Sequence, residues 1–105
     1  MTFVSGAIYE GQFGNGVPNG HGKWQNGGDT YEGDFEDGKR HGNGKIRMAN
    51  GKTYEGQWRE SLPHGHGVEI DEESGYRYEG EHVQGKRHGH GRLEMNGGKV
   101  YEGNF

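Results

Sequence analysis

The tripeptide Tyr-Glu-Gly occurs five times at nearly regular intervals, and this internal repeat limits the possible folds more than any other feature of the chain. Successive copies lie 22, 23, 24 and 23 residues apart and begin at Tyr9, Tyr31, Tyr54, Tyr78 and Tyr101. The first four copies share a Gly-X-Gly whose second Gly lies 13 residues after the Tyr. All variation in length therefore falls in the connector that follows, and each copy is predicted to be one fixed structural unit.

Each unit alternates as β-strands do. In the second copy, Tyr31-Glu32-Gly33-Asp34-Phe35 places rings and charges on opposite faces, and a second alternating run over residues 41–48 follows a turn-rich stretch. Two such strands joined by a short loop form a β-hairpin. The constant interval agrees with a hairpin, because a slip of one residue would move every ring to the opposite face.

The composition indicates a single layer rather than a packed two-layer core. Hydrophobic residues make up only 26% of the 105 residues, whereas the chain has 24 Gly, six Tyr, four Phe and two Trp. We expect Tyr31 and Phe35 to lie over the flat surface left by Gly33, Gly42 and Gly44. Because an isolated hairpin is only marginally stable, the hairpins are predicted to pair edge to edge into one elongated, all-β, single-layer antiparallel sheet.

Four stretches of the chain resemble MORN repeats, the membrane occupation and recognition nexus motif: YEGQFGNGVPNGHG, YEGDFEDGKRHGNG, YEGQWRESLPHGHG and YEGEHVQGKRHGHG. The resemblance covers essentially the whole chain. It implies a groove-shaped single sheet that serves as a scaffold, in partner recognition or in membrane attachment, and it implies no catalytic activity. We divide the array of residues 1–105 into a half repeat 1–8, the repeats 9–30, 31–53, 54–77 and 78–100, and a partial repeat 101–105.

Two copies depart from the shared pattern. His82 replaces the second ring of the fourth copy, so this copy is expected to pack least well. Ser61 replaces the turn Gly of the third copy, where the strand after the Gly pair reads Val68-Glu69-Ile70. This difference, together with the longest connector, predicts a shifted or bulged edge in the third copy.

The two ends carry incomplete repeats. Residues 1–8 have the pattern of a second strand, and residues 101–105 have that of a first strand without its partner. An unpaired edge strand is a template for another strand. Either the chain is a piece of a longer array, or these end strands pair with another copy of the chain.

Several classes of function are excluded by charge and residue usage. The formal net charge of -4 argues against a nucleic-acid partner, and the absence of Cys removes thiolate chemistry and fits a reducing compartment. The Gly-X-Gly lies within a strand pattern and opens no helix, so it is no phosphate loop. We therefore expect no enzyme and no cofactor.

Metal binding is also not expected. The pairs His64 and His66, and His88 and His90, could each offer two ligands on one face of a strand, but no third or fourth ligand is evident. Equivalent strands of adjacent hairpins lie about 9.5 Å apart, too far for the pairs to share one ion easily. The five Glu of the Tyr-Glu-Gly motif should form a ladder at the same spacing and meet Lys or Arg of neighbouring strands.

The face that carries the rings is the leading candidate for a functional surface. A single layer should leave these rings partly uncovered, and a contiguous exposed aromatic patch marks an interaction surface. We expect the second-ring positions to be more available than the Tyr. The predicted groove, which would bind a helical or extended segment of a protein partner, consists of Tyr9, Phe13, Trp24, Tyr31, Phe35, Tyr54, Trp58 and Tyr78.

A membrane function is the alternative. Lys39, Arg40, Lys86 and Arg87 occupy the same turn two repeats apart and could present a basic row to anionic phospholipids. Protonation of the seven His would change the formal charge from -4 to +3 and make such binding pH-dependent. Under either hypothesis the chain is expected in the cytoplasm, within a cytoskeletal, ciliary or membrane-associated assembly.

Overall fold

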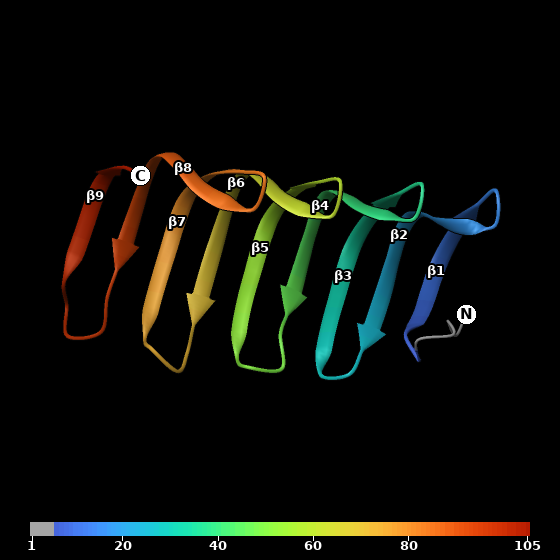
Figure 1. Ribbon diagram of the computed structural model, residues 1–105, viewed down its shortest axis with the longest axis horizontal. Coiled ribbons are helices and arrows are strands. Elements are labelled where there is room, and N and C mark those ends of the chain that lie inside the picture. The colour runs from blue at the N-terminus through green and yellow to red at the C-terminus, as the bar shows by residue number, and fades with distance from the viewer. Residues whose placement is uncertain (1–5) are drawn as a thin grey trace.

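The computed structural model describes residues 6–105, which form one open antiparallel sheet whose strands follow one another in sequence order (Figure 1). The sheet is elongated, with principal extents of 46, 25 and 17 Å. None of the described residues forms a helix that could cross a membrane. The strands are β1 (Ile8–Gly14), β2 (Val17–Asn26), β3 (Asp29–Glu36), β4 (Lys39–Arg47), β5 (Lys52–Arg59), β6 (Leu62–Asp71), β7 (Tyr76–Val83), β8 (Lys86–Glu94) and β9 (Val100–Asn104).

The prediction of stacked hairpins in a single layer is confirmed, and each hairpin has the same turn. Two residues with positive φ join the strands, as in Asp37 (φ 51°) followed by Gly38 (φ 80°). This is the type I′ geometry that matches the twist of the flanking strands. Ser61 (φ 67°) takes the place of the Gly in the third hairpin without changing the turn.

The Tyr of each repeat lies over the second Gly of its Gly-X-Gly, as the sequence predicts. A Cβ added at Gly44 would lie 2.1 Å from the Tyr31 hydroxyl oxygen, so no other residue fits there. The Tyr31 hydroxyl donates a hydrogen bond of 2.8 Å to the carbonyl of Asp34, which fixes the ring. The expected contact with Gly42 is wrong, because the Asp34 side chain occupies the space beside that residue.

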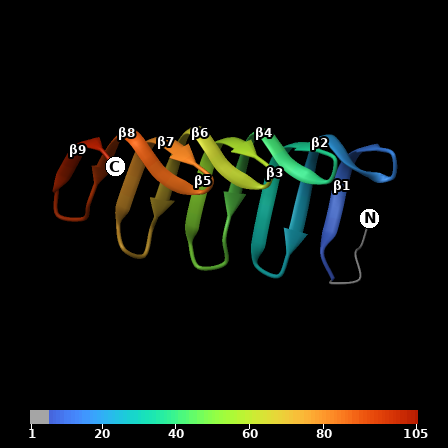
Figure 2. The same cartoon turned by 45° about the horizontal axis from the view of Figure 1, so that its top comes forward.

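A β-bulge interrupts each hairpin just after the first Gly of the repeat, as between Gly33 and Phe35. The bulge is therefore a property of all four hairpins, and its prediction for the third copy alone is wrong. That copy keeps the common register, with Glu69 opposite Tyr54 just as Ile46 lies opposite Tyr31. Bulges bend strands. The turn ends of the hairpins accordingly bend out of the plane of the rest of the sheet (Figure 2).

This bend places the second ring of each repeat between two Tyr side chains. Phe35 packs edge-on against Tyr31 of its own repeat at 5.0 Å between ring centroids, and against Tyr9 of the preceding repeat at 5.1 Å. Trp58 and His82 repeat the arrangement. Each such contact adds about 0.5 to 1.5 kcal/mol beyond the area that it buries. A continuous row of edge-to-face contacts thus joins the repeats and serves as the core.

His82 occupies its ring position fully. Its side chain is 1% exposed and lies 4.9 Å from the Tyr54 ring and 5.2 Å from the Tyr78 ring, between centroids. The expectation that the fourth copy packs least well is therefore wrong at this position. An imidazole has the flat shape that the edge-to-face geometry needs.

Candidate functional site

The bend of the sheet encloses a trough, which we define as two adjoining hollows on the face that carries the rings. The first is lined by Ala7, Val17, Pro18, Trp24, Phe35, Gly38, Arg40 and Ser61. The second includes Ile46, Met48, Tyr54, Trp58, Leu62, Pro63, Glu69 and Tyr76, and it shares Arg40 and Ser61 with the first. Arg40 therefore stands where the two hollows meet.

Most of the predicted groove residues form the floor beneath this trough rather than its surface. Relative exposure is 7% or less for Tyr9, Tyr31, Phe35, Tyr54, Trp58 and Tyr78. The expectation that a single layer leaves the rings uncovered is wrong for these six, because the bent hairpin ends close over them. Trp24 is half-buried and faces the first hollow, and Phe13 is 47% exposed. Second-ring positions are thus accessible only at Phe13 and, beyond the predicted set, at Phe105.

Arg40 lies across the rings of the second repeat and its neighbours. Its guanidinium carbon is 5.8, 5.6 and 5.0 Å from the ring centroids of Trp24, Tyr31 and Trp58. A guanidinium is attracted to the negative face of an aromatic ring. Its Nη2 donates to the carbonyl of Ser61 at 3.4 Å, and within residues 6–105 no carboxylate lies within 4 Å of it. The cation is therefore half-buried among rings without an ion-pair partner, and the carboxylate of Asp29 acts on it only from a longer distance.

Arg87 occupies the same place two repeats further along. It also lies over two rings, at 5.0 Å from the centroids of Tyr76 and Tyr78. Unlike Arg40, its Nε donates to Oε2 of Glu69 at 2.8 Å. The same carboxylate oxygen lies 3.3 Å from Nε2 of His82. The position that Glu69 takes in its repeat is held by Trp24 in the first repeat.

The pKa values of these groups differ in direction for that reason. Burial lowers the pKa of Arg40, whose positive charge is held away from water. Burial also disfavours the charge of Arg87, but the hydrogen bond to Glu69 outweighs it and raises the Arg87 pKa. Burial would raise the pKa of Glu69, yet the contacts from His82 and Arg87 hold it below its ordinary value. The Arg87 site is thus electrostatically closed, whereas the Arg40 site is open.

The four basic residues predicted to contact lipid do not form one row. Arg40 and Arg87 turn inward over the rings, whereas Lys39 and Lys86 are exposed at the turns. Lys39 Nζ lies 2.7 Å from Oε2 of Glu60 in the next hairpin. Neighbouring residues in the sequence therefore point to different sides of the bent hairpin end.

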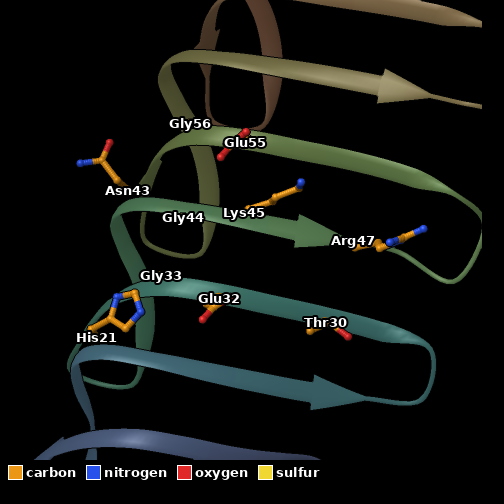
Figure 3. A pocket seen from close by; sticks show the side chains of 10 residues that line it. All are labelled: His21, Thr30, Glu32, Gly33, Asn43, Gly44, Lys45, Arg47, Glu55 and Gly56. Atoms are coloured by element: carbon orange, nitrogen blue, oxygen red, sulfur yellow. The ribbon is translucent and has the colours of Figure 1, made fainter.

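The opposite face of the sheet carries a ladder of alternating charge. Glu10, Lys23, Glu32, Lys45 and Glu55 pair in register across successive strands, and Glu79, Arg92 and Glu102 continue the series beyond Val68. The predicted meeting of Glu with Lys or Arg is confirmed by this register. Figure 3 shows part of the ladder around a shallow hollow, together with His21, Thr30, Asn43 and Arg47. Cross-strand pairs of opposite charge stabilise the sheet and cancel each other's field.

The His pairs that raised the question of metal binding lie on exposed or half-buried strand positions. Within the described part of the chain, no three His, Asp or Glu side chains are grouped closely enough to hold a metal ion. His66 instead lies 3.5 Å from a carboxylate oxygen of Glu79.

Two features of the trough are not evident from the repeat pattern. In the sequence, Ser61 is a turn substitution, whereas in the structure its hydroxyl accepts a 3.2 Å hydrogen bond from the Arg40 backbone amide and its carbonyl accepts one from the guanidinium. Glu69 is a break in an apolar pattern in the sequence, whereas in the structure it pairs with Arg87. The signal that could have found it was compensation, since Glu69 and His82 both replace apolar groups at positions that the repeat brings together.

A comparison with models of protein families gives one match: the MORN repeat, at residues 9–28, 31–53, 54–73 and 78–99. These four stretches cover most of the chain. A comparison with curated proteins gave no match.

Proposed function

The chain belongs to the MORN repeat family, and from this premise we propose that its trough binds an extended or helical segment of a protein partner. MORN repeats are in general modules of protein and membrane interaction, and the repeat type is not enzymatic. The observation that carries the proposal is the apolar lining of the first hollow, where Val17 is 38% exposed and Trp24 is half-buried beside the buried Ala7 and Pro18. Covering apolar surface of this kind removes it from water, which stabilises the complex with a partner.

The role that follows is that of a non-catalytic scaffold. We place it in the cytoplasm, in a cytoskeletal, ciliary or membrane-associated assembly. The core rings hold the repeats together, so the residues that face a partner are Trp24 and those around it rather than the buried Tyr. No residue pair in this proposal performs acid-base or nucleophilic chemistry.

Binding of anionic phospholipid is the weaker candidate. Two of its four cations, Arg40 and Arg87, face the rings, and Lys39 is paired with Glu60. Lipid recognition by a basic surface uses clusters of about four to eight Lys or Arg. The exposed Lys at the turns fall short of that number.

Self-association through the end strands also stays a prediction. Residues 101–105 include β9, which pairs with β8 along one edge and carries Tyr101 at 50% exposure. Residues 1–5 of the other predicted end lie outside the described residues. Sedimentation equilibrium over a range of concentrations would measure whether the chain forms dimers.

Site-specific photocrosslinking tests the proposed function. A benzophenone amino acid is placed at Trp24, which faces the trough, or at the adjacent Gln25, which is exposed on the opposite face. Native extract is irradiated, and crosslinked peptides are sequenced by mass spectrometry. We expect defined protein segments to be captured from position 24 and not from position 25. Equal capture at both positions, or capture of lipid alone, would contradict the proposal.

A further inference from the structure

Arg40 differs from Arg87, which holds the equivalent position two repeats further along, in having no carboxylate within 4 Å among residues 6–105. We propose that Arg40 recognises a carboxylate of the protein segment that lies in the trough, so that the partner is an apolar segment bearing an Asp or Glu side chain. This inference rests on the proposed function and specifies the chemistry of the partner.

The guanidinium is held ready for such a contact. The rings of Trp24, Tyr31 and Trp58 surround it, and backbone hydrogen bonds join its strand to the next hairpin, from the Ser61 amide to the Arg40 carbonyl at 2.9 Å. A guanidinium has five N–H donors in a planar fork. Among the described residues, the backbone carbonyl of Ser61 is the only group that accepts a hydrogen bond from the Arg40 guanidinium. Other N–H donors of the guanidinium are therefore available to a ligand.

The chain itself contains the arrangement that the ligand would complete. At the equivalent site two repeats away, Glu69 supplies a carboxylate oxygen 2.8 Å from Nε of Arg87. The first repeat has Trp24 in the register position of Glu69, so the carboxylate is replaced by a ring. Only Arg87 therefore has a carboxylate of the chain in direct contact, whereas Asp29 acts on Arg40 from beyond ion-pair distance, and a direct carboxylate contact at Arg40 has to come from a ligand.

The surroundings favour a protein carboxylate over a lipid phosphate. The hollow beside Arg40 is lined by Ala7, Val17, Pro18 and Trp24, which match apolar side chains on either side of the carboxylate. The turns that flank Arg40 carry exposed acidic groups, including Asp37 and Glu60, and the whole chain has a formal charge of -4. This negative charge would repel an anionic membrane surface, which is broad. A narrow peptide segment would bring only one carboxylate to the guanidinium between the rings.

Peptide selection against the complete chain tests the inference without a known partner. A random peptide library is displayed on phage and selected on the folded protein. The recovered peptides are synthesised with their Asp or Glu residues and again with Asn or Gln, and both forms are titrated by fluorescence anisotropy. We expect the acidic form to bind the unaltered protein at least tenfold more tightly than its amide form.

Variants of the protein locate that preference. Arg40→Gln should bind both forms of each peptide equally, whereas Lys39→Gln, which removes the same charge from the adjacent exposed residue, should keep the tenfold preference. Arg40→Met, which keeps an aliphatic stem over the rings, replaces Arg40→Gln if that variant loses its β circular dichroism. The amide peptides test the inference on the unaltered protein in any case.

The outcomes separate this inference from the proposed function. If recovered peptides lack acidic residues but lose binding to Trp24→Ala, the trough binds segments and the inference about Arg40 is wrong. A preference that survives in Arg40→Gln also overturns it. If no peptide is recovered, the proposed function and the inference fail together. Arg40-dependent binding to phosphatidylserine vesicles, with no acid preference among peptides, would assign Arg40 to lipid instead.

Discussion

Arg40 and Arg87 hold the same position in their repeats but differ in the side chains that surround them. Both side chains leave equivalent places in the bent hairpin ends and lie over aromatic rings. Around Arg87, Glu69 and His82 replace an apolar residue and a ring, and the three side chains form a polar cluster in which Glu69 pairs with Arg87, although neither nitrogen of the buried His82 makes a hydrogen bond to the described residues. Around Arg40, the equivalent positions keep their rings, Trp24 and Phe35, and no carboxylate of the described residues lies within 4 Å of the cation. The backbone is the same, so the difference comes from two substitutions in neighbouring repeats.

The comparison indicates that the frame that supports the trough and the surface of the trough are set by different residues. The frame consists of Tyr rings over Gly and is common to both regions. The surface is set by the residues that lie above the rings. Variants can therefore be chosen to affect both regions equally, only one of them, or neither.

The largest effect is expected from adding a methyl group beneath the Tyr rings. In Gly44→Ala and Gly91→Ala, the new Cβ would lie 2.1 Å from the Tyr31 hydroxyl oxygen and 2.5 Å from the Tyr78 ring, respectively. Both rings are buried and cannot move aside, so each variant should lose about 3 kcal/mol of unfolding free energy or fail to fold. Urea denaturation followed by circular dichroism measures the loss. Gly51→Ala is the control, with open space at its Cβ and only the strain of φ +90°, about 1 kcal/mol.

A marked difference between Gly44→Ala and Gly91→Ala would show that the frame is not common to the two regions.

Removing each guanidinium group in turn should change the unfolding free energy by different amounts in the two regions. Arg87→Met leaves Glu69 with His82 as its remaining partner, and we expect a loss of about 2 kcal/mol in unfolding free energy. Arg40→Met removes a half-buried charge that has no carboxylate partner, so the lost cation–π attraction is offset by the relief of desolvation, and the change should stay below about 1 kcal/mol. The measurement is the same denaturation at neutral pH. Equal losses in the two variants would contradict the distinction between a closed and an open site.

Converting the polar cluster to the pattern of the other repeats should make the two regions alike. The double variant Glu69→Ile/His82→Phe leaves Arg87 over its rings without a carboxylate, as Arg40 is, and places apolar groups at both positions. The lost ion pair and the gained apolar burial oppose each other, so we expect the unfolding free energy at neutral pH to change by less than about 1 kcal/mol. The folded-state pKa of Glu69 lies below its ordinary value, so its charge stabilises the fold above about pH 4.3, and this contribution is lost as pH falls through the folded pKa. The unaltered protein should therefore lose more stability than the double variant between about pH 5 and pH 3.

Denaturation curves at successive pH values test this expectation. Parallel losses in the two proteins over the acid range would mean that Glu69 contributes nothing specific to the Arg87 region.

The smallest effect is expected from Lys39→Gln. The side chains of Lys39 and Glu60 are 57% and 64% exposed, and surface pairs of this kind contribute little because water and salt screen them. We expect the urea midpoint to stay unchanged within error. A clear shift would indicate that the turn lysine supports the hairpin end, and the contrast between Lys39 and Arg40 would then need another explanation.

The fold follows from the sequence because the signals that specify it are local. The constant interval from Tyr31 to Gly44 sets the register of one hairpin, and the ring lies over the Gly that the register places beneath it. These relations hold within about a dozen residues and repeat along the chain, so they can be recognised without knowledge of the other repeats. Family resemblance agrees with them, because the same residues carry both.

The candidate site was only partly predictable, because it depends on the bend of the sheet. Period-two alternation places Phe35 and Trp58 on the ring face but does not say that bulges bring the hairpin ends over them and bury them. In the same way, Lys39 and Arg40 appear as one basic pair in the sequence, and the bend sends Arg40 inward and leaves Lys39 at the surface.

What the sequence determined by itself is therefore the hairpin, its register and the row of Tyr over Gly, since each of these depends on neighbours along the chain. Which rings are covered, and which Arg has a carboxylate beside it, depends on how the hairpins bend and pack. Glu69 and Arg87 are 18 residues apart and meet because adjacent hairpins pack side by side, as do Trp24 and Arg40. Contacts between repeats depend on the bend, and the bend arises from the bulges that every hairpin shares.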